Sequence, residues 1–452
     1  MNRNTFREYD IRGVAGVDLD AGAMETLGRA FGTYYRARDL RRLVAARDMR
    51  LSSEEYLAAL MQGLLSTGCD VIDIGLVPTP VLNYAVETLA ADGGLVVTAS
   101  HNPPQFNGLK SRTRTRAIFG ADLQEIWKVA QEGRFASGRG AREQRPILDD
   151  YGKRIHGDVR LRRQMHVAVD CGNGTAGVIA PRLLEALGCR LEPLYCEPDG
   201  RFPHHVADPT VPEYMADLAA AVRKTGAAAG IGFDGDADRV GLVDENGRLL
   251  FGDQLLVLFA RAILPQRPGA AVVFDVKCSQ ALVDEVRRLG GRPEMWRTGY
   301  PHIMSRMSET GAVLGGEMSG HMFFADRYYG FDDGIYAACR ALEILAAADR
   351  PLSALLADLP QFVSTPEIRV DSSDEDKFRI VEAVAAHFRP KHPTIDVDGV
   401  RILFPRGWAL VRASNTQPIL VLRFEADSDD ALAEIRGTVQ AELQSLGVQA
   451  GP

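Results

Sequence analysis

Short apolar runs alternate with amphipathic helical stretches along most of this chain, and this alternation is what most constrains its fold. The runs that we predict to form strands are Leu43–Ala46, Leu95–Thr98, Val167–Asp170, Ala229–Phe233, Val272–Val276 and Ala312–Leu314. Helical patterns lie between them, for example over Ala180–Leu187 and Gln280–Leu289. Alternation at this spacing predicts α/β units with mainly parallel sheets up to residue 360.

The pattern changes after Pro360 to charged, alternating segments around two helical stretches. The predicted strands are Glu367–Val370, Val400–Phe404, Trp408–Val411 and Ile419–Glu425, and the predicted helices are Glu375–Phe388 and Asp430–Leu446. This is typical of a separate α+β domain. We therefore place domain limits at 1–145, 146–247, 248–360 and 361–452.

The net charge and the cysteines argue against several classes of protein. The formal net charge of −8 argues against a nucleic-acid binder, and the six scattered cysteines form no C-x-x-C pair, which favours reduced thiols in a cytosolic enzyme. The first residues lack the apolar core of a signal peptide, and the longest apolar run, Leu255–Phe259, is too short to span a bilayer. We expect a soluble cytoplasmic protein with no membrane or nucleic-acid partner.

Polar, often Gly-rich loops follow several of the predicted strands. They are Arg47–Arg50, Ala99–Pro103, Cys171–Gly174, Asp234–Arg239, Lys277–Ser279 and Gly315–His321. In open α/β sheets, ligands bind at the carboxyl ends of strands, so the chemistry is expected in these loops.

Asp234, Asp236 and Asp238 occupy alternate positions directly after an apolar run. Carboxylates this close repel each other unless a cation neutralises them, and their oxygens suit Mg²⁺ or Ca²⁺. A calcium hand is excluded because Arg239 occupies the sixth position, which requires Gly. The alternatives are a solvated acidic loop and a metal loop, and the adjoining Arg239 favours a metal loop that handles phosphate.

Ser100 follows a predicted strand and precedes His101, with Lys110 ten residues further on. This position suits a nucleophile, although Ser also begins turns and helices. No G-x-S-x-G motif surrounds it, which disfavours a serine hydrolase.

Two further loops carry groups that bind sugars and phosphates. The segment Arg412–Pro418 offers a guanidinium, hydroxyls, an amide and main-chain N–H groups, which hold a phosphate, although a surface turn would have the same composition. In Gly315–His321, Glu317 and Ser319 can hydrogen-bond sugar hydroxyls, and His321 can carry a proton or bind phosphate.

One motif points to a different class of protein. Gly172, Gly174 and Gly177 form a G-x-G-x-x-G sequence between a predicted strand and helix, with Glu192 downstream, as in dinucleotide-binding folds. A single match is weak, and close packing around glycines explains it equally well.

Together these loops resemble the α-D-phosphohexomutase family, and within it the bacterial bifunctional phosphomannomutase/phosphoglucomutase branch. The resemblance runs from Phe6–Gly13 through Thr98–Pro103, Asp234–Arg239 and Gly316–His321 to Arg412–Pro418, in family order. It implies three related α/β domains and a smaller fourth domain around one deep cleft. It also implies interconversion of hexose 6-phosphate and hexose 1-phosphate (mannose, glucose or both) through a hexose 1,6-bisphosphate, with one Mg²⁺ per chain, and we expect a monomer.

The resemblance implies a role for each motif residue. Ser100 would carry the phosphate, and Mg²⁺ would bind Asp234, Asp236, Asp238 and phospho-Ser100. The residues that would bind substrate are Tyr9, Lys277, Tyr300, Glu317, Ser319, Arg412, Ser414, Asn415 and Thr416. Those that would support catalysis are Arg12, Lys110, Arg239 and His321, with Lys110 and His321 as candidates for the base.

Two positions depart from the family pattern. Ala237 stands where the family usually has Gly, which is tolerated unless φ is positive there. Tyr300 stands where relatives often carry a cleft His, so either Tyr300 or the neighbouring His302 takes that place.

Two other functions are compatible with the same motifs: a phosphoglucosamine mutase and a metal-dependent sugar phosphatase. Phosphoglucosamine mutases typically have Ser-Gly-Thr-Glu where this chain has Ser414–Gln417, and Gln where it has Met318, so both positions favour gluco and manno substrates. A metal-dependent sugar phosphatase could use the same Asp cluster and Ser100 but would release phosphate to water.

Overall fold

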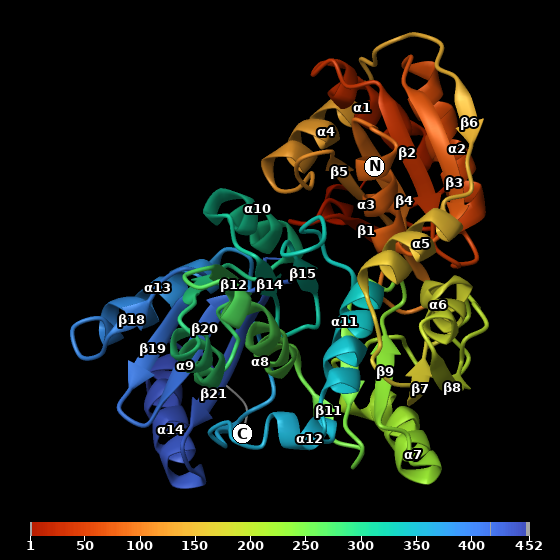
Figure 1. Ribbon diagram of the computed structural model, residues 1–452. Helices are drawn as coiled ribbons and strands as arrows, with labels where there is room; N and C mark the ends of the chain where they lie inside the picture. The colour runs from red at the N-terminus through yellow and green to blue at the C-terminus, as the bar shows by residue number, and fades with distance from the viewer. Residues whose placement is uncertain (1, 416, 449–452) are drawn as a thin grey trace.

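The computed structural model of the protein describes residues 2–415 and 417–448, which form four sheets flanked by helices (Figure 1). Each sheet is built from a contiguous part of the chain, and the four follow one another from the N-terminus to the C-terminus. The predicted fold class, three α/β domains and a smaller α+β domain, is confirmed. The exact domain limits stay a prediction. The first, third and fourth sheets each fall within one predicted domain, whereas the second sheet extends to β11 (Leu249–Leu250), just past the limit predicted at residue 247.

The first sheet has six strands in the order β1-β5-β4-β2-β3-β6, with β2, β3, β4 and β6 parallel and β1 and β5 antiparallel to their neighbours. Its strands are β1 (Ile11–Val14), β2 (Arg42–Arg47), β3 (Asp70–Leu76), β4 (Gly93–Val97), β5 (Phe106–Thr113) and β6 (Arg142–Gln144). Its helices are η1 (Arg3–Thr5), α1 (Ala21–Arg36), α2 (Ser53–Ser66), α3 (Thr79–Thr88) and α4 (Ala121–Glu132). All five residues of β4 are buried, as expected for a parallel strand covered on both faces.

The second sheet has the order β11-β10-β9-β7-β8, in which β7, β8 and β9 are parallel. Its strands are β7 (Met165–Asp170), β8 (Cys189–Leu194), β9 (Ala229–Phe233), β10 (Val240–Val243) and β11 (Leu249–Leu250). Its helices are α5 (Leu148–Asp158), η2 (Thr175–Val178), α6 (Ala180–Ala186), η3 (Pro212–Met215) and α7 (Ala216–Thr225). The strands β9 and β10 form a hairpin, so the acidic loop is its turn.

The third sheet has the order β13-β12-β14-β15. Its strands are β12 (Ala271–Asp275), β13 (Arg292–Trp296), β14 (Leu314–Gly316) and β15 (Met322–Phe324). Its helices are α8 (Gly252–Ile263), η4 (Leu264–Gln266), α9 (Gln280–Arg288), α10 (Tyr300–Thr310), α11 (Gly334–Ala347) and α12 (Leu352–Leu355). Helix α11 also contacts β9 and β10, so it packs between the second and third sheets (Figure 1).

The predicted strand at Ala312–Leu314 was placed two residues too early. Gly311 ends α10 in a left-handed conformation, and the N–H of Ala312 still donates to Met307 O of that helix. Because the helix cap uses these residues, the strand begins at Leu314.

The fourth sheet is wholly antiparallel, with the order β16-β21-β20-β19-β18 and β17 paired to β21. Its strands are β16 (Val363–Ser364), β17 (Ile368–Asp371), β18 (Thr394–Ile395), β19 (Val400–Phe404), β20 (Gly407–Ala413) and β21 (Ile419–Ala426). Its helices are α13 (Asp376–Phe388) and α14 (Asp429–Ser445). Apolar residues of both helices and of alternate strand positions form this domain's own core.

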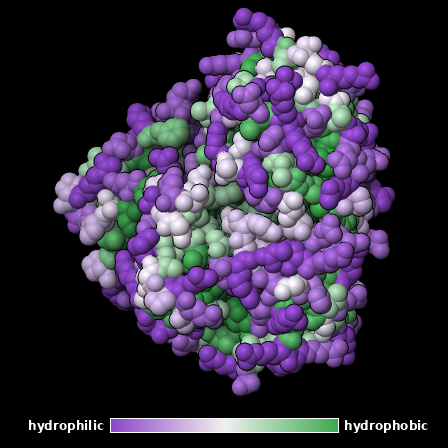
Figure 2. All heavy atoms as spheres, turned by 45° about the horizontal axis from the view of Figure 1, so that its top comes forward, coloured by the Kyte–Doolittle hydropathy of each residue, from purple (hydrophilic) through white to green (hydrophobic). Residues whose placement is uncertain are grey.

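The face of the molecule seen in Figure 2 is mostly hydrophilic, with hydrophobic side chains in small groups. Within residues 2–415 and 417–448, no helix is long and apolar enough to cross a membrane. All six cysteines are free thiols.

Candidate active site

Ser100 lies at the turn after β4, and its side chain faces the acidic loop of the second domain. Ser100 Oγ donates to Asp234 Oδ2 at 2.7 Å and lies 3.1 Å from His101 Nδ1. Its φ of +50° is left-handed, a strained conformation for a residue with a side chain. Burial and nearby cations lower the pKa of His101, which keeps that ring neutral beside the serine. The predicted serine and the predicted metal loop are therefore in contact.

The carboxylates of Asp234, Asp236 and Asp238 are fully buried, and one oxygen from each lies within 4.8 Å of the others. Lys110 Nζ donates to Asp236 Oδ2 at 2.7 Å and also pairs with Asp238. Burial alone would lower the pKa of Lys110, but the two carboxylates outweigh it and raise that pKa well above its usual value. Burial and the neighbouring carboxylates raise the pKa of Asp234.

The donor set of this loop fits a hard divalent cation. Among the described residues, Asp236 Oδ1 and Asp238 Oδ1 are buried yet meet no hydrogen-bond donor. Unsatisfied buried carboxylate oxygens are costly, and a bound Mg²⁺ would satisfy them.

The backbone at Ala237 has a φ of +62°. From the sequence, alanine is expected to be tolerated here unless φ is positive, so alanine is strained at this position. The methyl group is buried, and the conformation is maintained by hydrogen bonds from Ala237 N to Asp234 O and from Gly334 N to Ala237 O. A left-handed residue with a side chain costs about 1–2 kcal/mol. The surrounding structure supports this strain at the metal loop.

His321 connects Arg239 to a buried carboxylate. Arg239 Nε donates to His321 Nε2 at 2.9 Å, and His321 Nδ1 lies 2.9 Å from Asp332 Oδ2 and 3.5 Å from Asp238 Oδ1. Because Nε2 accepts a hydrogen bond, the ring proton lies on Nδ1 and faces the carboxylates. Among the described residues, His321 Nδ1 and Asp332 Oδ2 are buried and neither meets the geometry of a hydrogen bond.

Glu317 and Lys277 extend from loops of the third domain. Glu317 is buried and accepts from the N–H of Gly299 at 2.6 Å, and burial raises its pKa. Lys277 Nζ lies 3.4 Å from Glu367 Oε2 and 3.7 Å from Asp275 Oδ2. Ser319, two positions after Glu317, is partly exposed.

The fourth-domain loop meets the first domain through Tyr9. Asn415 Nδ2 donates to Tyr9 Oη at 3.0 Å, and Tyr9 Oη donates to Thr298 O at 2.7 Å. Arg412 Nε is held by Asp398 Oδ2 at 3.0 Å, and Ser414 Oγ accepts from the N–H of Gln417 at 3.2 Å. The predicted Thr416 lies outside the described residues.

Tyr300, rather than His302, faces the catalytic candidates. Its ring centroid lies 5.7 Å from Lys110 Nζ and 5.8 Å from the ring of His321. His302 instead makes edge contacts with Tyr9 and Phe119 at 5.7 and 5.1 Å.

Two arginines in the first domain hold the Ser100 loop. Arg12 contacts Asn102 and Ala99 O and is paired with Asp10. Arg50 is 2% exposed, and the carbonyls to which it donates are those of Ser100, Asn102, Pro103 and Phe106, at 2.6–2.9 Å. The role of Arg50 was missed, although its loop after a strand was singled out, because nothing in sequence shows an arginine folding back onto a loop fifty residues away.

The glycines of the dinucleotide-like motif are explained by packing. A Cβ at Gly174 would clash with the backbones of Cys171 and Gly235, and one at Gly177 with Cys196 O. The predicted alternative of close packing holds for both positions.

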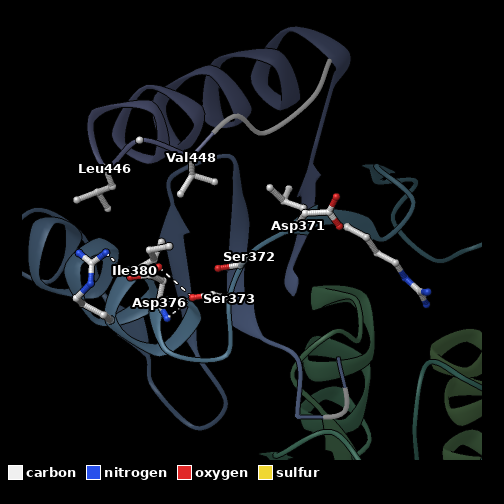
Figure 3. A pocket seen from close by; sticks show the side chains of 11 residues that line it. Asp371, Ser372, Ser373, Asp376, Ile380, Leu446 and Val448 are labelled. Carbon is white, nitrogen blue, oxygen red and sulfur yellow. Dashed lines mark hydrogen bonds and ion pairs between the residues drawn. The ribbon is translucent and has the colours of Figure 1, made fainter. Parts of the chain in front are cut away.

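A separate cavity lies away from these residues. It has a volume of about 600 Å³ between β17, α13 and the segment after α14, and Ser373 there bonds Asp376 at 3.0 Å (Figure 3). It contains none of the predicted site residues.

Ser100 faces a buried triad of carboxylates, and cationic and polar loops from all four domains surround them. This arrangement is typical of an enzyme that transfers a phosphoryl group. Family models for phosphoglucomutase/phosphomannomutase α/β/α domains I, II and III and for the C-terminal domain match residues 3–137, 149–247, 251–362 and 367–441. The chain belongs to the phosphoglucomutase/phosphomannomutase family.

Three relatives span essentially the whole chain. The chain is 46% identical over 442 residues to a phosphomannomutase/phosphoglucomutase of Pseudomonas aeruginosa, covering 98% of this chain and 96% of that protein. It is 40% identical to a phosphoglucomutase of Neisseria gonorrhoeae, covering 98% of each. A crystal structure of a family protein from Burkholderia thailandensis superposes with a TM-score of 0.95 at 44% identity, covering 100% of this chain and 99% of that one.

Proposed function

We propose that this chain is an isomerase that interconverts the 6-phosphate and 1-phosphate of hexoses, with mannose and glucose as the sugars. A phosphoserine at Ser100 and a hexose 1,6-bisphosphate would carry the phosphoryl group. The observation that carries the proposal is the 2.7 Å contact between Ser100 Oγ and Asp234 Oδ2, which joins loops of two domains. The names of the full-length relatives support the choice of sugars.

Each turnover has two balanced phosphoryl transfers. First, the bond between phosphorus and Ser100 Oγ breaks, and a bond forms to the free hydroxyl of the hexose phosphate. The proton of that hydroxyl passes to a base, and Ser100 Oγ takes up a proton. Of the two predicted candidates, Lys110 stays a charged ammonium because its carboxylate partners raise its pKa, which leaves His321 as the candidate base. After the bisphosphate turns end for end, the bond between its other phosphorus and the sugar oxygen breaks and a bond forms to Ser100 Oγ. The hydroxyl proton of Ser100 passes to the base, and the sugar oxygen takes up a proton.

Asp234, Asp236 and Asp238, together with the phosphate on Ser100, would hold the Mg²⁺, which when bound offsets the charge of the transferring group. Lys110 and Arg239 add positive charge from the protein itself and need no reorganisation during the reaction. Arg12 and Arg50 keep the Ser100 loop in place.

The sugar and the non-reacting phosphate are bound by the third and fourth domains. Glu317 and Ser319 would accept and donate hydrogen bonds to hydroxyls, and Arg412, Ser414 and Asn415 would hold the phosphate. The proposal assigns the same phosphate-binding role to Thr416. Lys277, Tyr9 and Tyr300 would line the space between, and the protein would act as a monomer.

The proposal is tested by incubating the purified protein and Mg²⁺ with glucose 1-phosphate, mannose 1-phosphate or glucosamine 1-phosphate. We expect isomerisation of the first two with no equivalent release of inorganic phosphate, and its loss in Ser100→Ala but not in the control Ser66→Ala on α2. Phosphate release in place of isomerisation would identify a phosphatase. Preference for glucosamine 1-phosphate would identify the amino-sugar mutase.

A further inference from the structure

The main-chain carbonyls of the turn that carries Lys277 are bound by side chains of the fourth domain. Residues 276–279 connect β12 to α9, with Lys277 as the second of them. Arg401 Nη1 donates to Val276 O at 2.8 Å and to Cys278 O at 2.7 Å, and Arg423 Nη1 donates to Lys277 O. Three consecutive carbonyls of the turn are thus bound by two guanidiniums from another domain.

The two arginines occupy matching places on the fourth sheet. Arg401 on β19 and Arg423 on β21 both pair in register with Leu410 on the intervening β20. Alternation along β20 puts Trp408, Leu410 and Arg412 on one face of the sheet. This face of the sheet therefore carries Arg401 and Arg423, which bind the Lys277 turn. It also carries Arg412, which leads into the proposed phosphate-binding loop.

The guanidiniums are buried and built into a fixed environment. Arg401 is 0% and Arg423 4% exposed, and Arg401 Cζ stacks 3.7 Å from the ring centroid of Trp408. Trp408 Nε1 donates to Glu425 Oε1 at 2.7 Å, and the same oxygen accepts from the N–H of Gln280, the first residue of α9, at 2.9 Å. The start of α9 is thus also bound by the fourth sheet.

Adhesion between two domains does not require this arrangement. Burying a guanidinium is costly, and apolar residues of similar volume hold interfaces at least as well. Among the described residues, Arg401 Nε and Arg423 Nε are buried without a hydrogen-bond partner, which adds to that cost. What two forked cations provide, and apolar residues do not, is a defined geometry for the carbonyls that they bind.

We propose that Arg401 and Arg423 are positioning residues that fix the Lys277 turn to the fourth sheet, so that Lys277 and Arg412 are placed as one unit. This inference rests on the proposed function, in which Lys277 and Arg412 both contact the hexose phosphate. The binding of substrate by the fourth domain is thereby coupled to the position of a third-domain lysine.

A double-mutant cycle on kcat/KM for glucose 1-phosphate tests this coupling. Arg401→Gln should lower kcat/KM about tenfold when Lys277 is present, within the range for residues that act through one another. In a Lys277→Met background the same substitution should change kcat/KM less than about twofold, because the turn that Arg401 holds no longer carries the lysine, and Arg412 lies on the fourth sheet itself.

Control variants separate positioning from general damage. Arg406→Gln removes an exposed arginine from the turn between β19 and β20 and should leave kcat/KM unchanged. Arg401→Lys keeps the charge but cannot donate in the same forked way, so it should lose activity while the melting temperature stays near that of the wild type. It is also the variant to use in the cycle if Arg401→Gln does not fold.

If Arg401→Gln lowers kcat/KM equally with and without Lys277, the positioning role is wrong. The proposed function would still stand, provided that the wild type isomerises hexose phosphates. Wild-type kinetics in Lys277→Met would overturn the positioning role too, since Lys277 would then have no role to be positioned for. A wild type that does not isomerise hexose phosphates would overturn the proposed function itself.

Discussion

Ala237 carries a methyl group at a backbone position, φ +62°, that glycine adopts more easily. In Ala237→Gly, relief of about 1–2 kcal/mol of strain is offset by the lost burial of one methyl group, about 0.8 kcal/mol, and by the flexibility of glycine when unfolded, about 0.4–1 kcal/mol. We expect a change in unfolding free energy below about 1 kcal/mol. Ala237→Val should lose about 2 kcal/mol or more, because a branched side chain is strongly disfavoured there. Urea denaturation measures both, and an undiminished stability in the Val variant would contradict the left-handed assignment.

In the proposed function, Glu317 hydrogen-bonds hydroxyls of the sugar. Glucose and mannose differ only at the 2-hydroxyl, so a carboxylate serving both should bind hydroxyls that they share. Glu317→Ala should lower kcat/KM for both sugars by roughly 5- to 150-fold, the equivalent of about 1–3 kcal/mol for unpaired hydroxyls. Steady-state kinetics with both 1-phosphates checks this. A loss confined to mannose 1-phosphate would show that Glu317 reads the 2-position instead.

At the scale of elements, Asp333 ties three segments together. Its carboxylate caps α11 by accepting from the N–H of Tyr336 at 2.8 Å, and it also accepts from the hydroxyls of Tyr151 on α5 and Tyr328, each at 2.9 Å. Burial raises the pKa of Asp333 to about 7.

The raised pKa makes the contribution of Asp333 depend on pH. A carboxyl whose folded pKa lies above its unfolded value stabilises the fold fully below about pH 4, and that contribution is lost as pH rises through 7. Asp333→Asn does not titrate, so its stability deficit relative to the wild type should shrink by roughly 2 kcal/mol between pH 5 and pH 8. Denaturation curves at both pH values measure it, and a deficit that grows with pH would contradict the assignment.

The elements were largely predictable because their causes are local. Burial on both faces makes strands such as β7 and β9 continuous apolar runs, and the helices α9 and α13 show a helical period. The start of β14 was misplaced because Gly311 and Ala312 read as strand onset but serve as the cap of α10. The left-handed φ of Ala237 could not be predicted either, since alanine carries no signal for it.

At the scale of the whole molecule, Tyr9 connects the first domain to the third and fourth by contacting Thr298 and Asn415. Tyr9→Phe removes both hydrogen bonds, and with about 1 kcal/mol at stake we expect kcat/KM to fall roughly fivefold. Tyr34→Phe is the matched control, because its hydroxyl bonds Asp122 within the first domain at 2.8 Å. Equal kinetics for Tyr9→Phe and the wild type would show that this contact does not serve the site.

Contacts between domains could not be predicted from the sequence. The motif loops, including Ser100 and the three aspartates, could be found because each has its own local chemistry. Other residues of the site have partners that are far away in the sequence and come close only in the folded chain. Arg50, Asp332 and Arg401 are examples, and no spacing in the sequence indicates their partners. The choice between Tyr300 and His302 likewise needed the structure, since only α10's orientation decides which ring faces Lys110.

The central claim is that the phosphate on Ser100 passes to the sugar. The most direct measurement is a single-turnover chase, in which enzyme labelled with ³²P on Ser100 is mixed with unlabelled glucose 1-phosphate and Mg²⁺ and the label is followed over time. The account predicts that label leaves Ser100 and appears first in glucose 1,6-bisphosphate and then in glucose 6-phosphate. Label that is released as inorganic phosphate, or that stays on the protein while glucose 6-phosphate forms, would contradict it.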